Sequence, residues 1–155
     1  MRITGLLVTG TISLIIFTCS SAFGQETSYP EKGNQFSSFI LKIHGIDKIK
    51  GEVRIAVFNS KETYADKKDS FRSAVVSVES DTVSWEFAEF PFGEYAIAVY
   101  HDENMNGEMD TNLLGIPKED YGFSNNARGR FGPASWEDAR FIVSQSINTH
   151  SIKLN

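Results

Sequence analysis

The sequence predicts an all-β fold, an antiparallel β-sandwich of about seven strands with one long irregular loop. Three observations lead to this prediction: apolar residues alternate in short runs, turn residues separate the runs, and no segment shows the period of a long helix. Antiparallel strands at such spacing typically build two packed sheets around one core. We therefore expect one β-sandwich domain over residues 36–155, of which residues 101–138 form the loop.

The first 24 residues differ from the rest and predict a cleavable secretory signal. A single charge at Arg2 precedes an apolar run that is too short and too interrupted to favour a membrane span. Ala22-Phe23-Gly24 places small residues where a signal peptidase cuts. Lipid attachment at Cys19 is the competing interpretation, and Thr18 is a poor residue before a lipid-modified cysteine. We expect export to the periplasm or the medium, without a lipid anchor.

Cleavage after residue 24 leaves 131 of the 155 residues, with no cysteine and no second apolar stretch long enough to cross a membrane. A chain of this length forms one domain and buries an adequate core without a disulfide. It keeps all 20 acidic residues and, after loss of Arg2, 14 of the 15 basic ones, a net charge of −6 with histidine neutral. Because an acidic surface repels phosphate backbones and anionic lipid, we expect neither a nucleic-acid partner nor membrane binding.

The predicted strands follow a flexible polar lead-in at residues 25–35. Several of the runs have a period of two, as in Phe39, Leu41 and Ile43, and the second run is apolar on both faces. β-Branched Val75, Val76 and Val78 indicate the third run. The runs cover residues 39–43, 53–57, 75–78, 83–87, 95–99, 141–143 and 147–154. The charged residues 61–70 predict a surface turn or one short helix. Residues 79–81 predict a hairpin turn, and Pro91-Phe92-Gly93 turns the chain into the fifth run.

Residues 101–138 show no strand or helix period of any length. A connection this long is far beyond ordinary lengths, so the loop is either disordered or functional and internally braced. Its apolar residues favour order, because an unstructured linker would not carry them. These predicted anchors are Leu113, Leu114, Ile116, Tyr121, Phe123, Phe131 and Trp136.

Inside this loop, residues 102–110 match the first three quarters of a calcium-binding loop. Side-chain oxygens stand at positions one, three, five and nine, and glycine at position six allows a sharp bend. Position seven offers its backbone carbonyl. The predicted metal ligands are Asp102, Asn104, Asn106, Glu108 and Asp110, with Glu108 acting through its carbonyl.

Position twelve departs from the helix-loop-helix calcium site, which has a bidentate glutamate there. Leu113 stands at this position and cannot bind a cation, and the loop follows a strand rather than a helix. A calcium site between strands needs another oxygen donor, and Glu119, Asp120 and Asp138 are the nearest acids. With a ligand missing, we expect a Kd on the order of 0.1 to 1 mM. The alternative is a tight turn at Asn106-Gly107 with solvated acids around it.

Two further groups of residues suggest other functions. His101 beside Asp102 could form an acid–base pair, although a histidine at the mouth of a loop more often orients the chain by hydrogen bonding. The sequence lacks Gly-x-Ser-x-Gly, a phosphate-binding glycine loop and His-Glu-x-x-His, the usual signatures of hydrolases, nucleotide-binding proteins and metalloproteases.

The second group is an aromatic platform flanked by amide and guanidinium donors, which would suit a sugar or a peptide. Its members are Tyr121, Phe123, Asn125, Asn126 and Arg128. The alternative is a loop whose amides bond its own backbone.

The turn before the fifth run resembles a segment of transthyretin-like and carboxypeptidase-regulatory-like sandwiches. Pro91 sets the turn, Gly93 permits the tight reversal, and Tyr95 packs while its hydroxyl reaches the backbone. The chain resembles the exported bacterial family known as domain of unknown function 2141 over about residues 39–154, and the long loop is the most specific part of this resemblance. The matching motifs are residues 95–99, 101–104, 106–107, 110–112, 115–119, 121–126 and 131–133. This resemblance implies a small secreted or periplasmic β domain without an established activity.

Together these observations favour a non-catalytic binding or accessory module, with calcium as a structural ion and a protein, peptide or carbohydrate as its partner. The alternative is a periplasmic or extracellular enzyme that acts on carbohydrate or peptide, with His101 and Asp102 in its site.

Overall fold

Eight strands, two short α-helices and one 3-10 turn make up the domain. The computed structural model describes residues 35–130 and 132–155, so the predicted signal (residues 1–24) and the lead-in up to residue 34 lie outside it. The strands are β1 (Phe36–His44), β2 (Glu52–Phe58), β3 (Arg72–Ser77), β4 (Thr82–Pro91), β5 (Gly93–Asp102), β6 (Tyr121–Phe123), β7 (Phe141–Val143) and β8 (Ile147–Lys153). The helical segments are α1 (Lys61–Asp66), η1 (Ser124–Asn126) and α2 (Trp136–Ala139). Within the described ranges no helix is long and apolar enough to cross a membrane.

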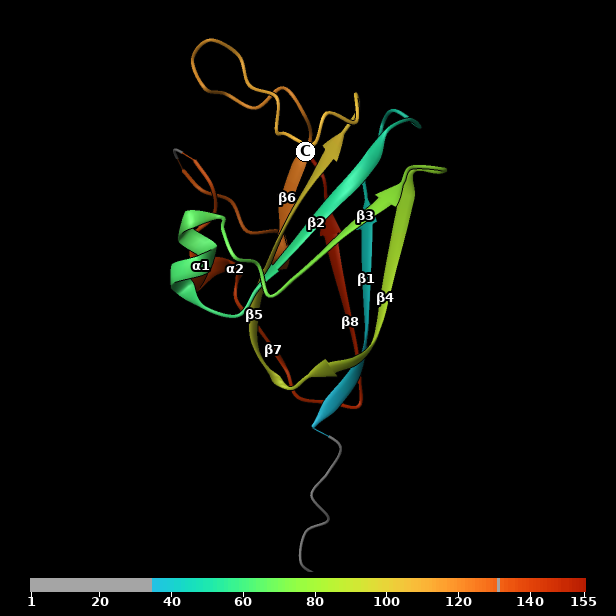
Figure 1. Ribbon diagram of the computed structural model, residues 1–155, viewed down its shortest axis with the longest axis vertical. Coiled ribbons are helices and arrows are strands. Elements are labelled where there is room, and N and C mark those ends of the chain that lie inside the picture. Colours follow the sequence, from blue (N-terminus) through green and yellow to red (C-terminus); the bar gives the residue numbers. More distant parts are fainter. Residues whose placement is uncertain (1–34, 131) are drawn as a thin grey trace, which may run out of the picture. The chain divides into compact units, whose positions relative to one another are not determined.

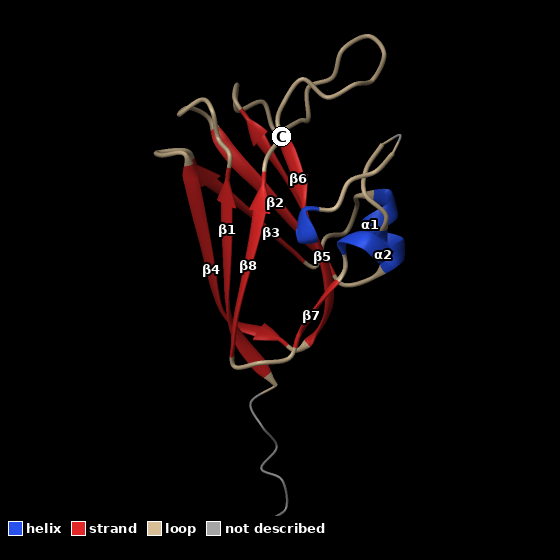
Figure 2. Ribbon diagram, turned by 180° about the vertical axis from the view of Figure 1, so that it is seen from behind, coloured by secondary structure: helices blue, strands red, loops and turns tan. Residues whose placement is uncertain are grey.

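The strands form two sheets that face each other (Figures 1 and 2). One sheet has the order β4-β1-β8 and the other β3-β2-β5-β6, while β7 pairs with the start of β5. This arrangement confirms the predicted all-β sandwich. One pair differs from the antiparallel expectation, because β1 and β8 run parallel. No hairpin joins the first strand to the last one, so a tight turn does not dictate their relative direction.

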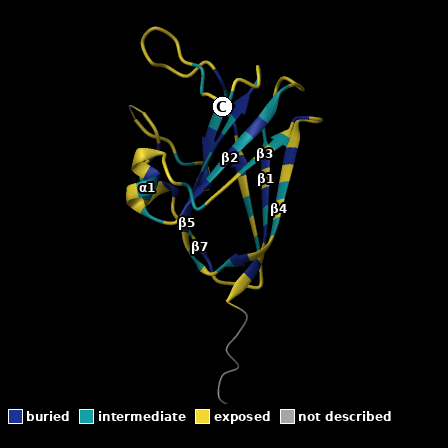
Figure 3. Ribbon diagram, viewed as in Figure 1, coloured by how far each residue is buried: buried dark blue, intermediate teal, exposed yellow. Residues whose placement is uncertain are grey.

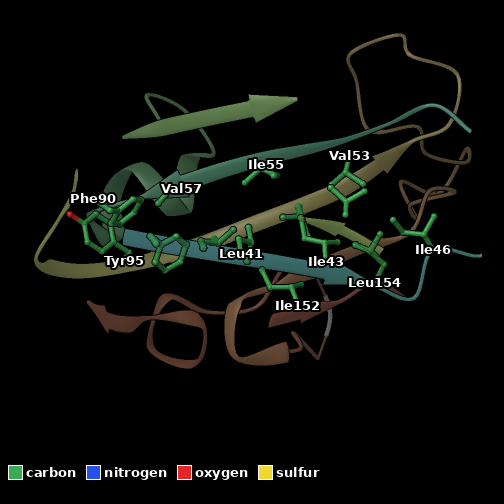
Figure 4. Close-up of a cluster of buried hydrophobic side chains, with 14 of the residues drawn as sticks. Leu41, Ile43, Ile46, Val53, Ile55, Val57, Phe90, Tyr95, Ile152 and Leu154 are labelled. Carbon is green, nitrogen blue, oxygen red and sulfur yellow. The ribbon is translucent and has the colours of Figure 1, made fainter. Parts of the chain in front are cut away.

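The main core lies between the two sheets, because alternate residues of each strand point inward. Leu41 and Ile43 of β1 and Val53, Ile55 and Val57 of β2 are all buried there (Figures 3 and 4). Every second residue of these strands is therefore buried, as the alternating apolar runs predict.

Aromatic rings close the core where β4 turns into β5. The Phe39 and Phe90 rings stack with centroids 4.6 Å apart, and Tyr95 packs against Phe90 at 4.8 Å. The Tyr95 hydroxyl donates a hydrogen bond to the Pro91 carbonyl at 3.1 Å. This contact confirms the predicted role of the tyrosine after the turn.

A second apolar cluster covers part of the outer face of the larger sheet. Small side chains at Ala56, Ala96 and Ala98 let the aromatic ring of Tyr64 from α1 approach the strands. The helix α1 confirms the short helix predicted at residues 61–70. It begins after Ser60, whose hydroxyl accepts a hydrogen bond from the Thr63 amide.

The predicted long loop contains regular structure, so the expectation that residues 101–138 have none was wrong. Strand β5 continues to Asp102, β6 pairs with β5, and η1 and α2 follow. Each of these additions is at most four residues long, too short to show a period in the sequence. Residues 103–120 form the longest irregular segment, and part of it projects beyond the strands (Figure 1). Residues 127–130 and 132–135 are irregular as well.

The prediction that apolar residues anchor the loop by burial was wrong for three of them. Leu113 is fully exposed, with an exposed fraction of 105%, and Leu114 and Ile116 are exposed as well. They lie on a small turn that Asn112 organises, because its side-chain oxygen accepts hydrogen bonds from the amides of Leu114 and Ile116. Local hydrogen bonds therefore order this tip without burying its side chains. Phe131 lies outside the described residues.

Candidate functional site

The site begins at Asp102, the last residue of β5, whose exposed fraction is 0%. The register places Asp102 opposite Glu52 of β2. Arg54, two residues further along β2, therefore has its side chain on the same outer face of the sheet. The Arg54 Nε donates to the Asp102 Oδ2 at 2.9 Å, and its Nη2 lies 2.6 Å from the Glu52 carboxylate. A buried, paired carboxylate thus marks the point where the strand ends and the loop starts.

Hydrogen bonds to Asp102 hold the residues that follow it against the sheet. The main-chain amides of Asn106 and Gly107 donate to its Oδ1 and Oδ2 at 3.1 and 2.8 Å. Gly107 has a φ of +85°, a conformation that glycine adopts at little cost. The Tyr100 hydroxyl holds the same residue from the strand side, since it donates to the Gly107 carbonyl at 3.0 Å. We call residues 102–110 the acidic turn.

The other predicted ligands gather on the same turn. Asn104 Nδ2 and Asn106 Nδ2 donate to the two carboxylate oxygens of Asp110 at 2.8 and 3.3 Å. The Asn104 side-chain oxygen accepts from the Asn106 amide, which Asp102 also binds. The Asn106 side-chain oxygen accepts from the Glu108 amide at 2.8 Å. The structure therefore brings together the side chains of Asp102, Asn104, Asn106 and Asp110, and the main chain of Glu108.

Glu119, one of the three acids considered as an additional ligand, lies beneath the acidic turn. Its exposed fraction is 7%, and its two oxygens accept from the amides of Glu103 and Asp110 at 3.2 and 3.0 Å. One carboxylate thus ties the two ends of the turn together. Asp120 contributes its carbonyl, which accepts from the His101 amide, whereas Asp138 accepts a hydrogen bond from Ser135 near α2.

Charged and main-chain donors keep Asp102 and Glu103 ionised. Burial by itself would raise the pKa of Asp102, but hydrogen bonds from the Gly107 amide, Arg54 and the Asn106 amide outweigh it and lower the pKa. Hydrogen bonds from Lys48 and Lys50, at 2.8 and 3.0 Å, lower the pKa of the Glu103 carboxyl. The start of the acidic turn therefore carries two carboxylates at neutral pH.

The donor set of the acidic turn suits calcium, which prefers oxygen ligands. The Asp102 Oδ1 accepts one hydrogen bond and keeps a second lone pair. The amide groups of Asn104 and Asn106 now point their nitrogens at Asp110, and half a rotation of each would present an oxygen instead. In residues 35–130 and 132–155, no three His, Cys, Asp or Glu side chains converge as a metal cluster. A cation here would therefore need amide and main-chain oxygens in addition to carboxylates.

His101 and Asp102 lie on opposite faces of β5, as neighbours in a strand do. His101 stands opposite the core residue Val53, is buried, and places its Nε2 2.7 Å from the Lys50 carbonyl. That contact requires the Nε2 to carry the proton, and the buried Nδ1 has no described partner. The structure therefore does not bring the two members of the predicted acid–base pair to one place.

The two asparagines of the proposed ligand platform bond the chain itself. The Asn125 side-chain nitrogen donates to the carbonyls of Asp138 and Arg140, at 3.0 and 2.9 Å. The Asn126 side-chain oxygen accepts from the Lys153 amide at 2.8 Å. These contacts match the alternative in which loop amides bond their own backbone.

The remaining platform residues surround a very small hollow. Phe123 is buried, and it lines this pocket together with Tyr121, Asn126 and Arg128. The pocket volume is about 10 Å³. This is room for roughly one water molecule, whereas small-molecule sites usually measure roughly 300 Å³ or more.

Sequence analysis did not select Arg54, Tyr100 or Gly51, which complete the site. Gly51 has a φ of +68°, and a Cβ atom at this position would lie 2.3 Å from the Asp102 carbonyl oxygen. Arg54 and Tyr100 share the outward parity of Asp102 in their strands. That parity was visible in the sequence, but the register that brings these side chains together was not.

Two facing sheets with an acidic turn held against the outer face of one of them define a small β-sandwich domain with a loop braced by carboxylates. The chain belongs to the family described as "Uncharacterized protein conserved in bacteria (DUF2141)", whose model matches residues 41–151. This match confirms the resemblance and includes the whole acidic turn. Comparisons with curated proteins and with solved structures gave no match.

Proposed function

We propose that this chain is a non-catalytic binding or accessory domain that works outside the cytoplasm, and that its acidic turn binds calcium as a structural ion. The observation that carries the proposal is the gathering of side-chain oxygens from Asp102, Asn104, Asn106 and Asp110 on one turn. Glu119 ties the ends of that turn together.

Electrostatics supports a cation at this place. Asn106 donates to both Asp102 and Asp110, the Asp110 amide donates to Glu119, and Arg54 is the only basic side chain of the described residues in hydrogen-bond contact with any of these acids. The acids give the turn a negative potential, which a divalent cation would lower. The ion would therefore stiffen the turn rather than act on a substrate.

The predicted export of the chain also supports calcium binding. The predicted signal at residues 1–24 sends the chain to compartments where calcium is abundant, and calcium sites of extracellular modules bind on the order of 0.1 to 1 mM. A site with few carboxylates belongs at this weak end. The enzyme alternative lacks comparable support, because His101 and Asp102 lie on opposite faces of β5.

Thermal unfolding in calcium and in EDTA tests the proposal. With a Kd of about 0.1 mM, 1 mM calcium adds roughly 1.4 kcal/mol to the free energy of unfolding. For a domain of this size the melting temperature then rises by several degrees. Coincident melting curves for the wild-type protein would contradict the proposal.

A matched pair of variants separates ligation from general screening of acidic charge. Asp110→Asn removes a carboxylate of the turn, so the calcium-dependent shift should disappear. Asp120→Asn removes an equal charge nearby, from a residue that contributes only its carbonyl here, so the shift should remain. Equal loss of the shift in both variants would show that calcium acts only by screening.

A further inference from the structure

Strand β3 is an edge of the larger sheet, and within the described residues its outward backbone groups have no hydrogen-bond partner. Among the described strands it pairs only with β2, in an antiparallel register that aligns Val78 with Gly51. The Val78 amide donates to the Gly51 carbonyl at 3.1 Å, and in such a ladder every second residue faces the partner strand. The residues of β3 whose amide and carbonyl groups point away from β2 are therefore Ser73, Val75 and Ser77.

Two other edges that the structure describes carry protection of the kind that edges of soluble β proteins usually show. Strand β4 is interrupted by a bulge, and its exposed Glu89 has a φ of +61°. At the end of β8, Asn126 binds the Lys153 amide, and Asn155 exchanges backbone hydrogen bonds with Tyr121. These contacts cover the C-terminal end of β8.

Strand β3 has none of these protections. Residues 73–77 contain no charge and no proline, and their pairing with β2 shows no bulge. The side chain of Val75, in the middle of the strand, is 54% exposed. Strand β3 ends the larger sheet, and β4, which follows it in the chain, belongs to the other sheet (Figure 1). An edge that is regular and uncharged is a template for another strand.

We infer that this edge pairs with β3 of a second copy of the chain, antiparallel and about a two-fold axis at Val75. In this register Ser73 lies opposite Ser77 of the partner subunit, and the two copies of Val75 face each other. Pairs of hydroxyl residues and of β-branched residues are favourable across antiparallel strands. Each of the three pairs of outward residues exchanges two backbone hydrogen bonds, six in total.

The pattern of the strand favours a second copy over an unrelated strand. A two-fold axis at Val75 makes this edge self-complementary, because each outward residue among Ser73, Val75 and Ser77 then meets a residue of the same kind. The nearest charges, Arg72 at the start of β3 and Glu79 beyond its end, stay apart from their own copies in this register. The pairing joins the larger sheets of two molecules into one continuous sheet. It involves no residue of the acidic turn, so it stands independently of calcium.

The variant Val75→Pro tests this pairing in the purified protein obtained from the full chain. Proline lacks only the amide that points away from β2, so the ladder within the monomer is preserved. We expect sedimentation equilibrium to show twice the monomer mass for the wild type. Association of Val75→Pro should be weaker by at least about tenfold. Val75→Thr keeps the amide and the β-branched shape, so it should associate like the wild type.

Hydrogen exchange gives a second readout that does not depend on the folding of the proline variant. In the wild type, exchange of the amides of Ser73, Val75 and Ser77 should slow as protein concentration rises. The amides of Ala74 and Val76, which face β2, should be slow at every concentration. A wild-type protein that stays monomeric, a Val75→Pro variant that associates as tightly, or outward amides insensitive to concentration would overturn the inference.

Discussion

Two consecutive parts of the chain, residues 103–120 and residues 121–130 with 132–140, are ordered for different physical reasons. The first is held by hydrogen bonds to the buried carboxylates of Asp102 and Glu119, while the leucines at its tip are exposed. The second is held by apolar burial against Phe58 and Tyr64. The first segment therefore depends on buried charges, whereas the second depends mainly on apolar burial.

The buried polar contacts of the second segment are neutral, whereas its ion pairs, Glu137 with Lys61 and Arg140 with Glu94, lie at the surface. Ser124 is buried, accepts a hydrogen bond from the Ile97 amide at 2.9 Å and donates to the Ala139 carbonyl at 2.5 Å. The Tyr64 hydroxyl donates to the Ala134 carbonyl at 3.0 Å. Hydrogen bonds of this kind are insensitive to pH in the range where carboxylates titrate.

Phe123→Ala should have the largest effect, because it removes a buried ring from the second segment. We expect a loss of about 3–5 kcal/mol in the free energy of unfolding, measured by urea denaturation. The loss should be the same with calcium and with EDTA. A loss that depended on calcium would show that the two segments are not held independently.

Asp102→Asn should have the next largest effect, on the first segment. The substituted amide keeps the shape but loses the charge that accepts from Arg54 and from two main-chain amides. Hydrogen bonds to a charged group contribute about 1.5–3 kcal/mol, and we expect a loss of this size in urea denaturation. Asp81→Asn, at an exposed acid whose side chain makes no described hydrogen bond or ion pair, serves as the control and should change stability by less than about 0.5 kcal/mol. An equal effect in both variants would remove the special role of Asp102.

Acid should reduce the difference between the wild type and Asp102→Asn. The pKa of Asp102 is lowered in the folded protein, so its stabilisation is fully present above the ordinary carboxyl pKa of about 3.9. The stabilisation is lost as the pH falls through the lower, folded-state pKa. The difference in free energy should therefore be constant between about pH 5 and 7 and narrow below about pH 4. A difference that widened in acid would contradict this assignment.

The smallest effect is expected at the exposed tip of the first segment. The double variant Leu113→Ser and Leu114→Ser should change the free energy of unfolding by less than about 0.5 kcal/mol, because neither side chain is buried. Thermal and urea unfolding measure this directly. A loss comparable to that of Phe123→Ala would mean that the tip packs on the domain.

Sequence analysis predicted the features that depend on neighbours along the chain. The alternation of Val53, Ile55 and Val57 was sufficient for strand β2, and the spacing of oxygen donors was sufficient for the acidic turn. Strand β6 was missed because three residues carry no period. The exposure of Leu113 was missed because local hydrogen bonds, rather than burial, order its turn.

Features that depend on strand pairing were beyond the sequence. The contact of Arg54 with Asp102 follows from the register of β2 and β5. The separation of the His101 and Asp102 side chains follows from the continuation of β5 to Asp102, because neighbours in a strand face opposite ways. The parallel pairing of β1 with β8 joins the two ends of the domain, so no local pattern encodes it. The sequence of one strand shows which residues share a face, but the residues that stand opposite them are known only once the partner strand is placed.

Amide hydrogen exchange at Gly107 and Asp110 tests the central claim most directly, namely that Asp102 and Glu119 hold the acidic turn. At neutral pH both amides should exchange slowly in the wild type, because Gly107 donates to Asp102 and Asp110 donates to Glu119. Asp102→Asn should accelerate exchange at Gly107, and Glu119→Gln should accelerate it at Asp110, while the amides of β2 stay protected. Fast exchange of both amides in the wild type, or rates that neither substitution changes, would contradict the account.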